Sequence, residues 1–166
     1  ASSLVSANRI PRALQLIEQA MKQERMSDAQ RVFALLTRSQ AHSQGGNMAL
    51  AVSDARAARA IRDDASTQQF LASLLVDTPE RQEGLGIMRK MLADSPDNTG
   101  LMNNFGYSLV DDHASAAELD EGFRMLKQAI RLTPDEPNLL DSMGWAYYQY
   151  GDFREANRFI EMALEA

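Results

Sequence analysis

The chain has 166 residues, of which 45% are hydrophobic and 24% are charged, so it can bury a core and is not expected to be a disordered tail. Its formal net charge of −6 argues against a nucleic-acid binder and against a basic membrane-surface helix, because both need clustered cations. It contains no cysteine, which excludes disulfides and thiolate sites in this piece, and no apolar run approaches the roughly 18 residues of a membrane-spanning helix.

Helical spacing of apolar residues begins near the amino end. Residues 1–11 contain neither an initiator methionine nor a signal-peptide pattern, so we expect an excised or mature part of a longer protein. In Arg12–Glu24 the apolar residues recur at intervals of three and four, which predicts an amphipathic helix. A further helix is predicted to stop at Gly45-Gly46, and the helix after it carries the alanines Ala51, Ala55 and Ala58.

The rest of the chain continues the helical spacing, with turn residues between the helices. Thr78-Pro79-Glu80 predicts a helix start, with a capping threonine, a proline in the first turn and an acid favoured by the helix dipole. Glu121–Leu132 has the same periodicity as the first predicted helix. No segment alternates apolar and polar residues as a strand does, so the protein is predicted to be all-α. Further helix stops are predicted at Asp94-Ser95-Pro96-Asp97, Thr133-Pro134-Asp135 and Gly151-Asp152.

The apolar pattern recurs about every 34 residues. When Gly106 is aligned with Gly144, Leu126 falls on Ile160, and the same phase holds in the preceding repeat. Small residues, at the points where helices are expected to cross, share this phase: Ala72, Gly84, Gly122, Ala156 and Ala163. The methionines Met88, Met91, Met102 and Met143 fall at core places. We predict repeats at 32–64, 65–98, 99–136 and 137–166 after a partial repeat at 1–31, with about four extra residues around Asp112–Ala117.

This pattern resembles the tetratricopeptide repeat, whose signature is W-x₂-L-G-x₂-Y followed by A-x₃-F, A and P. The tryptophan of the signature is replaced in every repeat, and Ser39 stands where glycine or alanine is usual. The resemblance implies an all-α fold, a right-handed α-solenoid of antiparallel helix hairpins with about four and a half repeats in a single array over residues 1–166. The last repeat carries the signature best, through Leu140, Met143, Gly144, Tyr147, Gly151, Ala156, Ile160 and Ala163.

In this family the first helix of each hairpin lines a concave groove that binds a peptide or protein segment, so the resemblance implies a non-catalytic interaction scaffold. The carboxyl-terminal half combines aromatic residues with carboxylates, which favours a basic or amide-rich partner. The cationic clamp of chaperone-binding members is absent, because Leu36, Gln69, Asn103 and Asp141 hold its places. The groove residues carried over from the family pattern include Phe33, Leu36, Gln40, Gln69, Ser73, Asn103, Tyr107, Val110, Asp111, Asp141, Trp145 and Tyr148.

Other interpretations of these residues stay open. Trp145 and Tyr148 can instead pack against a following repeat, and Asp111 and Asp141 can be ordinary solvated charges. The alternative function is a structural one, in which the open ends of the repeats stack on further copies and form homo-oligomers.

The sequence contains no catalytic, cofactor or metal motif that its spacing supports. His42 and His113 form no HExxH or comparable pair, and Gly84-Leu85-Gly86 lacks the third glycine and the preceding strand of a dinucleotide site. The acidic stretch that runs from Asp111 to Glu121 lacks the spacing of a calcium loop. We therefore expect no enzyme activity, no cofactor and no metal site.

Residues 99–166 add a narrower resemblance. The stretches Asn104–Asp111 and Asp141–Tyr148 are similar to tetratricopeptide proteins of proteobacteria, many of which are periplasmic or outer-membrane lipoproteins. Some of these proteins act as adaptors for a protease or as scaffolds of envelope assemblies. The resemblance thus implies an adaptor in a bacterial envelope assembly, and it favours the periplasm over the cytoplasm.

Overall fold

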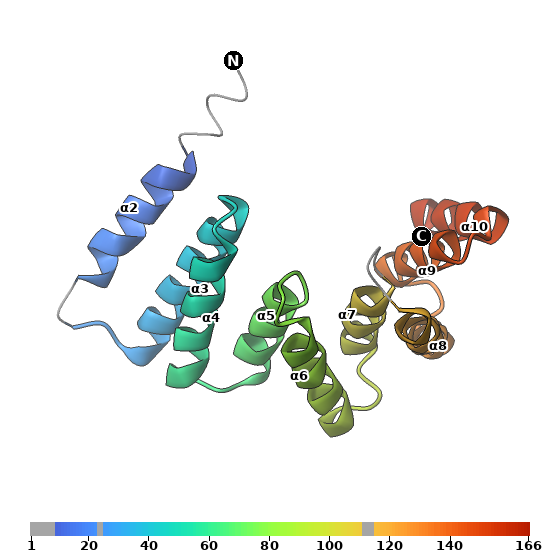
Figure 1. Ribbon diagram of the computed structural model, residues 1–166, viewed down its shortest axis with the longest axis horizontal. Coiled ribbons are helices and arrows are strands. Elements are labelled where there is room, and N and C mark those ends of the chain that lie inside the picture. Colours follow the sequence, from blue (N-terminus) through green and yellow to red (C-terminus); the bar gives the residue numbers. More distant parts are fainter. Residues whose placement is uncertain (1–8, 23–24, 111–114) are drawn as a thin grey trace, which may run out of the picture. The chain divides into compact units, whose positions relative to one another are not determined.

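A computed structural model describes residues 9–22, 25–110 and 115–166, and all regular secondary structure in these ranges is α-helical (Figure 1). This confirms the all-α prediction. The helices are α2 (Arg9–Met21), α3 (Asp28–Gln44), α4 (Met48–Ile61), α5 (Ala65–Leu75), α6 (Arg81–Asp94), α7 (Thr99–Leu109), α8 (Ala116–Leu132), α9 (Pro137–Gln149) and α10 (Phe153–Glu165).

The chain divides into two compact units, one that ends at Ile87 and one that begins at Met88. In the first unit α3 and α4 form an antiparallel hairpin, and α2 packs against α3 (Figure 1). In the second unit α7 pairs with α8 and α9 pairs with α10 (Figure 1). The division falls inside α6, so the predicted repeat at 65–98 contributes to both units.

Capping side chains set several helix starts. At the start of α3, Ser27 accepts a hydrogen bond from the backbone N–H of Gln30, and the Gln30 side chain accepts one from the backbone N–H of Ser27. This capping box begins the helix at Asp28, before the predicted repeat start at residue 32. The helices α5, α7 and α9 begin at residues 65, 99 and 137, where repeat starts are predicted.

The predicted helix stops are confirmed, and one predicted start needs a correction. Gly46 and Gly151 both adopt a φ of 77°, the left-handed conformation in which glycine ends a helix without strain. The Thr78 hydroxyl accepts from the backbone N–H of Glu80, as a cap should, but α6 begins only at Arg81. Pro79 therefore lies in a turn before the helix, because the Arg81 N–H bonds to the Thr78 carbonyl three residues back.

The two helices of the α7–α8 hairpin touch at glycines. A Cβ atom added to Gly106 would lie 2.8 Å from Leu126 Cγ and 3.2 Å from the Gly122 carbonyl oxygen. A Cβ atom added to Gly122 would lie 2.7 Å from the Gly106 carbonyl oxygen. Since real Cβ contacts are longer, only glycine allows this backbone approach.

The same crossing recurs in neighbouring hairpins. A Cβ atom on Gly144 would lie 2.8 Å from Ile160 Cδ1, as one on Gly106 would from Leu126. In the first unit, a Cβ atom on Gly84 would lie 2.9 Å from the Ala72 carbonyl oxygen. Small residues thus recur where the helices of successive hairpins cross, which confirms the prediction from the sequence comparison.

Ser39 shows how a polar side chain takes the place of glycine or alanine at such a crossing. Its side chain is fully buried between α3 and α4, and its hydroxyl donates a 2.6 Å hydrogen bond to the Ala51 carbonyl oxygen. Because the hydroxyl has a partner, its burial does not carry the desolvation penalty of an unpaired polar group.

Each unit has its own apolar core. Among the described residues of the first unit, one cluster of buried apolar side chains lies around Val32 and Leu35, and another lies around Leu71 and Leu75. In the second unit, a cluster of buried residues joins Leu126 of α8 to Met102 of α7 and to Leu139 and Met143 of α9. The methionines predicted to be core residues are all buried, which confirms that prediction: Met88, Met91, Met102 and Met143.

We predict that Gly84→Ala destabilises the protein by about 1–3 kcal/mol, because the new methyl group would be forced against the Ala72 carbonyl and Leu75. Gly86, two residues along the same helix, is exposed and has no atom within 4 Å of an added Cβ. Gly86→Ala should therefore stabilise by about 0.5–1 kcal/mol through helix propensity. Urea unfolding followed by circular dichroism measures the free energy of unfolding of both variants. Equal effects would contradict the close approach of the two helices at Gly84.

Candidate functional site

A pocket in the second unit gathers four of the predicted groove residues. Its volume is about 340 Å³, at the lower end of the range for ligand pockets in proteins. We call it the aromatic pocket. It is lined by Tyr107 from α7, by Asp141, Gly144, Trp145 and Tyr148 from α9, and by Phe153, Ala156, Asn157 and Ile160 from α10.

One face of α9 supplies the main side chains of the aromatic pocket. Asp141, Trp145 and Tyr148 are separated by four and three residues, so they lie on the same side of the helix. The Trp145 and Tyr148 rings stack with their centroids 5.3 Å apart and an interplanar angle of 16°. Phe153, from the start of α10, meets Tyr148 edge to face at 5.5 Å. These contacts hold the rings in place before any ligand arrives.

Three of the aromatic side chains that line this pocket are largely exposed to solvent. Tyr107 is 48% exposed, Tyr148 51% and Phe153 63%. Within the described part of the chain, neither tyrosine hydroxyl has a hydrogen-bond partner, and the Asp141 carboxylate has neither a hydrogen bond nor an ion pair. Large apolar rings with free polar ends are the typical composition of protein-binding hot spots.

A second aromatic cluster in the same unit serves packing instead. Phe123 makes edge-to-face contacts at 4.9 Å with both Tyr147 and Tyr150, and Tyr147 stacks on Phe159 at 5.3 Å. The Tyr150 hydroxyl donates to the Asp120 carboxylate. Burial and then this hydrogen bond raise the pKa of Tyr150 to about 12. The hydroxyl of Tyr150 thus has a partner within the fold, whereas those of Tyr107 and Tyr148 have none among the described groups.

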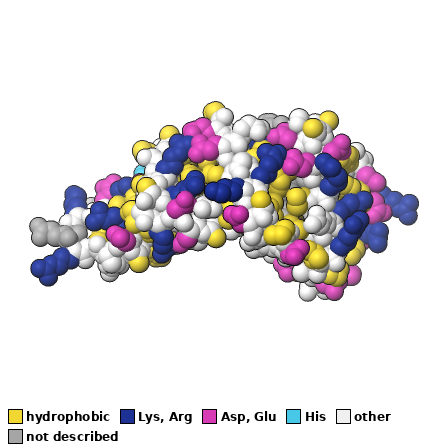
Figure 2. Space-filling model, turned by 90° about the horizontal axis from the view of Figure 1, so that it is seen from below, with side chains coloured by type: hydrophobic (Ala, Val, Ile, Leu, Met, Phe, Trp, Pro, Cys, Tyr) yellow, Lys and Arg dark blue, Asp and Glu magenta, His cyan; other side chains and the backbone are white. Residues whose placement is uncertain are grey.

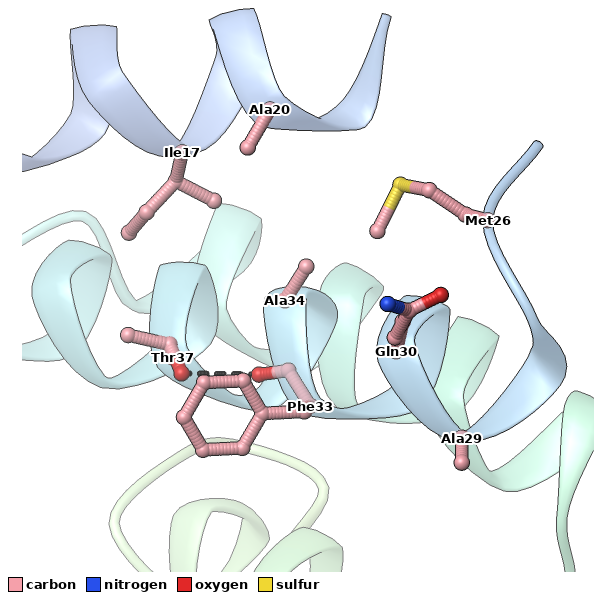
Figure 3. A pocket seen from close by; sticks show the side chains of 8 residues that line it. All are labelled: Ile17, Ala20, Met26, Ala29, Gln30, Phe33, Ala34 and Thr37. Atoms are coloured by element: carbon pink, nitrogen blue, oxygen red, sulfur yellow. Dashed lines mark hydrogen bonds between the residues drawn. The ribbon is translucent and has the colours of Figure 1, made fainter. Parts of the chain in front are cut away.

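The first unit has a pocket of different chemistry, which we call the apolar pocket. It has a volume of about 460 Å³, lies between α2 and α3, and has no charged side chain in its lining. Figure 3 shows Ile17, Ala20 and Ala34 facing one another across it, with Met26 reaching in from the connection between the helices. Phe33, a predicted groove residue, lies at its edge and is 73% exposed, and its carbonyl accepts a hydrogen bond from Thr37 (Figure 3).

The other groove candidates of the first unit are not gathered into a pocket that the structure describes. Gln40 and Ser73 are exposed, and the Ser73 hydroxyl donates to the Phe70 carbonyl oxygen of its own helix. Gln69 is half-buried. Leu36 is half-buried against the core cluster of Val32, Leu35 and Ala58.

In the second unit, three candidates on or after α7 differ in their placement. The side-chain oxygen of Asn103 is buried and has no hydrogen-bond partner among the described groups. Val110 was expected in the groove, but it is fully buried in the core, because α7 ends at Leu109 and the chain turns inward to pack on Gly122. Asp111 lies outside the described residues.

Sequence reasoning missed Phe153 and Asn157, because both lie on α10 and the family pattern assigns the groove to first helices only. A signal for Phe153 was present in the sequence. Phe153 is three and seven residues before Ala156 and Ile160, so helical periodicity places it on the face of α10 that turns toward α9.

The described members of the acidic stretch have structural partners. Glu118 accepts from Ser115 in the capping box of α8, Asp120 accepts from Tyr150, and Glu121 pairs with Arg89 at 2.9 Å. Asp112 and His113 lie outside the described residues. Across the described ranges, no three His, Asp or Glu side chains are grouped so that they could hold a metal ion.

A charged cluster is buried between α3 and α4. Arg38 donates two hydrogen bonds to Asp54, of 2.7 and 2.6 Å, and Asp54 is 7% exposed. The hydrogen bonds to Asp54 raise the pKa of Arg38. His42, one turn along α3, has its Nε2 atom 4.0 Å from Asp54, and its buried Nδ1 atom has no partner among the described groups. The bidentate geometry indicates a structural tie between the two helices.

Charged residues elsewhere are intermingled on the surface. Figure 2 shows Lys and Arg side chains interspersed with Asp and Glu on the face that it presents. Ion pairs join side chains of different helices, among them Arg56 of α4 with Glu83 of α6 at 2.6 Å. None of the described helices combines the length and the apolar composition that crossing a bilayer requires.

Comparison with known proteins points to the same family of repeats. No protein-family profile matches the chain. A TPR repeat-containing protein of Pseudomonas aeruginosa is 34% identical over 99 residues, which are 60% of this chain but only 16% of that protein. This relative confirms the resemblance to tetratricopeptide repeat proteins, although the chain spans only that small part of its length.

Solved structures of MamA are similar in fold. A crystal structure of MamA has a TM-score of 0.64 and 19% identity, with 96% of this chain and 90% of that chain covered. The structure of MamA residues 41 to the end from Desulfovibrio magneticus RS-1 has a TM-score of 0.67 and 15% identity, with 99% and 89% covered. The likeness confirms the predicted fold class, an α-solenoid of helical hairpins, and at these identities it shows the fold alone.

We predict that Asp54→Ala destabilises the protein by about 2–3 kcal/mol, because it leaves the partly buried Arg38 without its charged hydrogen-bond partner. Asp63→Ala is the matched control, since Asp63 pairs with Arg59 on the surface and is 56% exposed at its side chain. That variant should cost less than about 1 kcal/mol. Urea unfolding compares the two, and a small effect of Asp54→Ala would show that the cluster is not a structural tie.

We also predict that the protonated hydroxyl of Tyr150 stabilises the folded state relative to the unfolded state at alkaline pH. The folded pKa of about 12 lies above the ordinary value of about 10, so this contribution is complete below pH 10 and is lost as the pH rises to 12. Asp120→Asn should lower the pKa without restoring the ordinary value, because burial is the larger cause. Tyrosinate absorbance during alkaline titration measures this, with Tyr150→Phe to assign the signal.

Proposed function

We propose that this chain is a non-catalytic interaction module that binds a peptide or protein segment in the aromatic pocket. The observation that carries the proposal is the set of aromatic rings around one cavity: Tyr107, Tyr148 and Phe153 are largely exposed, and ring contacts join the half-buried Trp145 to Tyr148 and Tyr148 to Phe153. Burial of rings that are already fixed costs little conformational entropy, so such a surface gains affinity efficiently.

The chemistry of the lining supports recognition over catalysis. The lining contains no histidine, serine or lysine, and its ionisable groups, Asp141 and the hydroxyls of Tyr107 and Tyr148, form no hydrogen bond with one another. General acid–base or nucleophilic catalysis needs such a partner within hydrogen-bond reach. The fold of helical hairpins, which presents side chains on open surfaces, supports the same proposal.

We extend the proposal to the cellular role expected from the sequence. The resemblance of residues 99–166 to proteobacterial proteins, together with the relative from Pseudomonas aeruginosa, supports a bacterial adaptor or scaffold. An envelope assembly in the periplasm, with the chain forming part of a lipoprotein, is the setting that we propose.

Self-association is the second candidate function, and exposed apolar side chains favour it. Leu164 on α10 is 83% exposed and Phe33 on α3 is 73% exposed, and contact with a further copy would remove these apolar side chains from water. In this alternative, the open ends of the repeats contact further copies of the chain.

The test is selection of peptides from a random display library on the immobilised protein, followed by fluorescence anisotropy with the labelled peptides. Trp145→Ala and Tyr107→Ala should each weaken binding at least about tenfold, since truncating a hot-spot ring costs about 2 kcal/mol or more. Tyr150→Phe is the control, because Tyr150 is an aromatic residue of the same unit outside the pocket lining.

Two results would overturn the proposal. One is that no peptide is enriched above the background of an unrelated protein. The other is that the selected peptides bind the Trp145→Ala and wild-type proteins equally, with circular dichroism showing that the variant is folded.

A further inference from the structure

We infer that the aromatic pocket takes the guanidinium group of an arginine side chain in an extended partner segment. The inference rests on the proposed function and specifies its ligand. It starts from the combination of an unpaired carboxylate with exposed aromatic faces in one cavity.

Charge complementarity is the first argument. Asp141 is the only charged side chain in the lining, and it lies on the exposed side of α9, where no group in the described part of the chain pairs with it. Two other acidic residues near helix starts in the same unit do have partners: Glu118 is part of the capping box of α8, and Glu155 accepts from Arg158. A cation from a partner would supply the missing charge to Asp141.

The rings next to Asp141 supply the second argument. Trp145 and Tyr148 stack on each other; Trp145 also packs against the core cluster around Leu126, whereas Tyr148 remains 51% exposed, and both line the pocket. Tyr107 and Phe153 add two further exposed rings from other helices. Aromatic faces attract cations, and Trp and Tyr do so most strongly.

The shape of this arrangement favours arginine over lysine. A planar guanidinium can stack on an aromatic ring and at the same time donate two parallel hydrogen bonds to a carboxylate, which an ammonium cannot do. The Asn157 amide nitrogen donates to Glu161, and its oxygen accepts no hydrogen bond from the described groups, which leaves it to accept one from a partner's backbone N–H.

The experiment uses synthetic peptide libraries with random flanks and one fixed central residue, which is arginine, lysine, citrulline or glutamate. Citrulline keeps the shape of arginine without its charge. We expect wild-type protein to bind the arginine library at least tenfold more tightly than the citrulline library, with lysine in between. Asp141→Asn should reduce the arginine preference to less than threefold, and Glu136→Gln, an isosteric change on the same helix outside the pocket, should leave it intact.

The outcomes separate this inference from the proposed function. If the arginine and citrulline libraries bind equally while Trp145→Ala still abolishes binding, the pocket binds peptides but the guanidinium assignment is wrong. If Trp145→Ala changes nothing, the proposed function itself fails. If light scattering shows a dimer that Trp145→Ala dissociates, the occupant is a second copy of this chain, and the arginine inference is overturned.

Discussion

The close approach of two helices at a pair of small residues is the constraint on which this structure depends. In the α7–α8 hairpin, Gly106 and Gly122 bring backbone against backbone, and a single added methyl group would collide with a carbonyl oxygen. Where one partner is not glycine, as at Ser39, the side chain is short enough to stay within the crossing and bonds to the opposing backbone. Because isolated hairpins bury little apolar surface, the tight crossings let neighbouring hairpins share a core.

The same constraint shapes the candidate site. Gly144 and Ala156 are small so that α9 and α10 can cross, and both also line the aromatic pocket. With little side-chain volume at the crossing, the larger residues on either side, Trp145 and Phe153, stand around a hollow instead of filling it. A requirement of the fold thus leaves room for a ligand at a place where two helices already fix the surrounding rings.

The fold was predictable because its determinants are local and repeated. Glycines at 45–46 and at 151 and the recurring small residues mark helix ends and crossings in the sequence itself. The site was predictable only in part, since a family pattern names positions on first helices and is silent about α10, which contributes Phe153. It also misplaced Val110, because whether the residue that follows a helix turns inward depends on the opposing Gly122. The buried pair of Arg38 and Asp54 involves residues 16 apart, and no periodicity reveals such a pairing.

The position of Trp145 gives the protein its own optical reporter. The sequence contains a single tryptophan, and that residue stacks on Tyr148 inside the candidate site. Indole emission from the whole molecule therefore originates at one wall of this cavity. Any molecule that enters and displaces water from the ring would shift the wavelength maximum or the lifetime of that emission. The measurement needs no label, and no second tryptophan contributes to the signal.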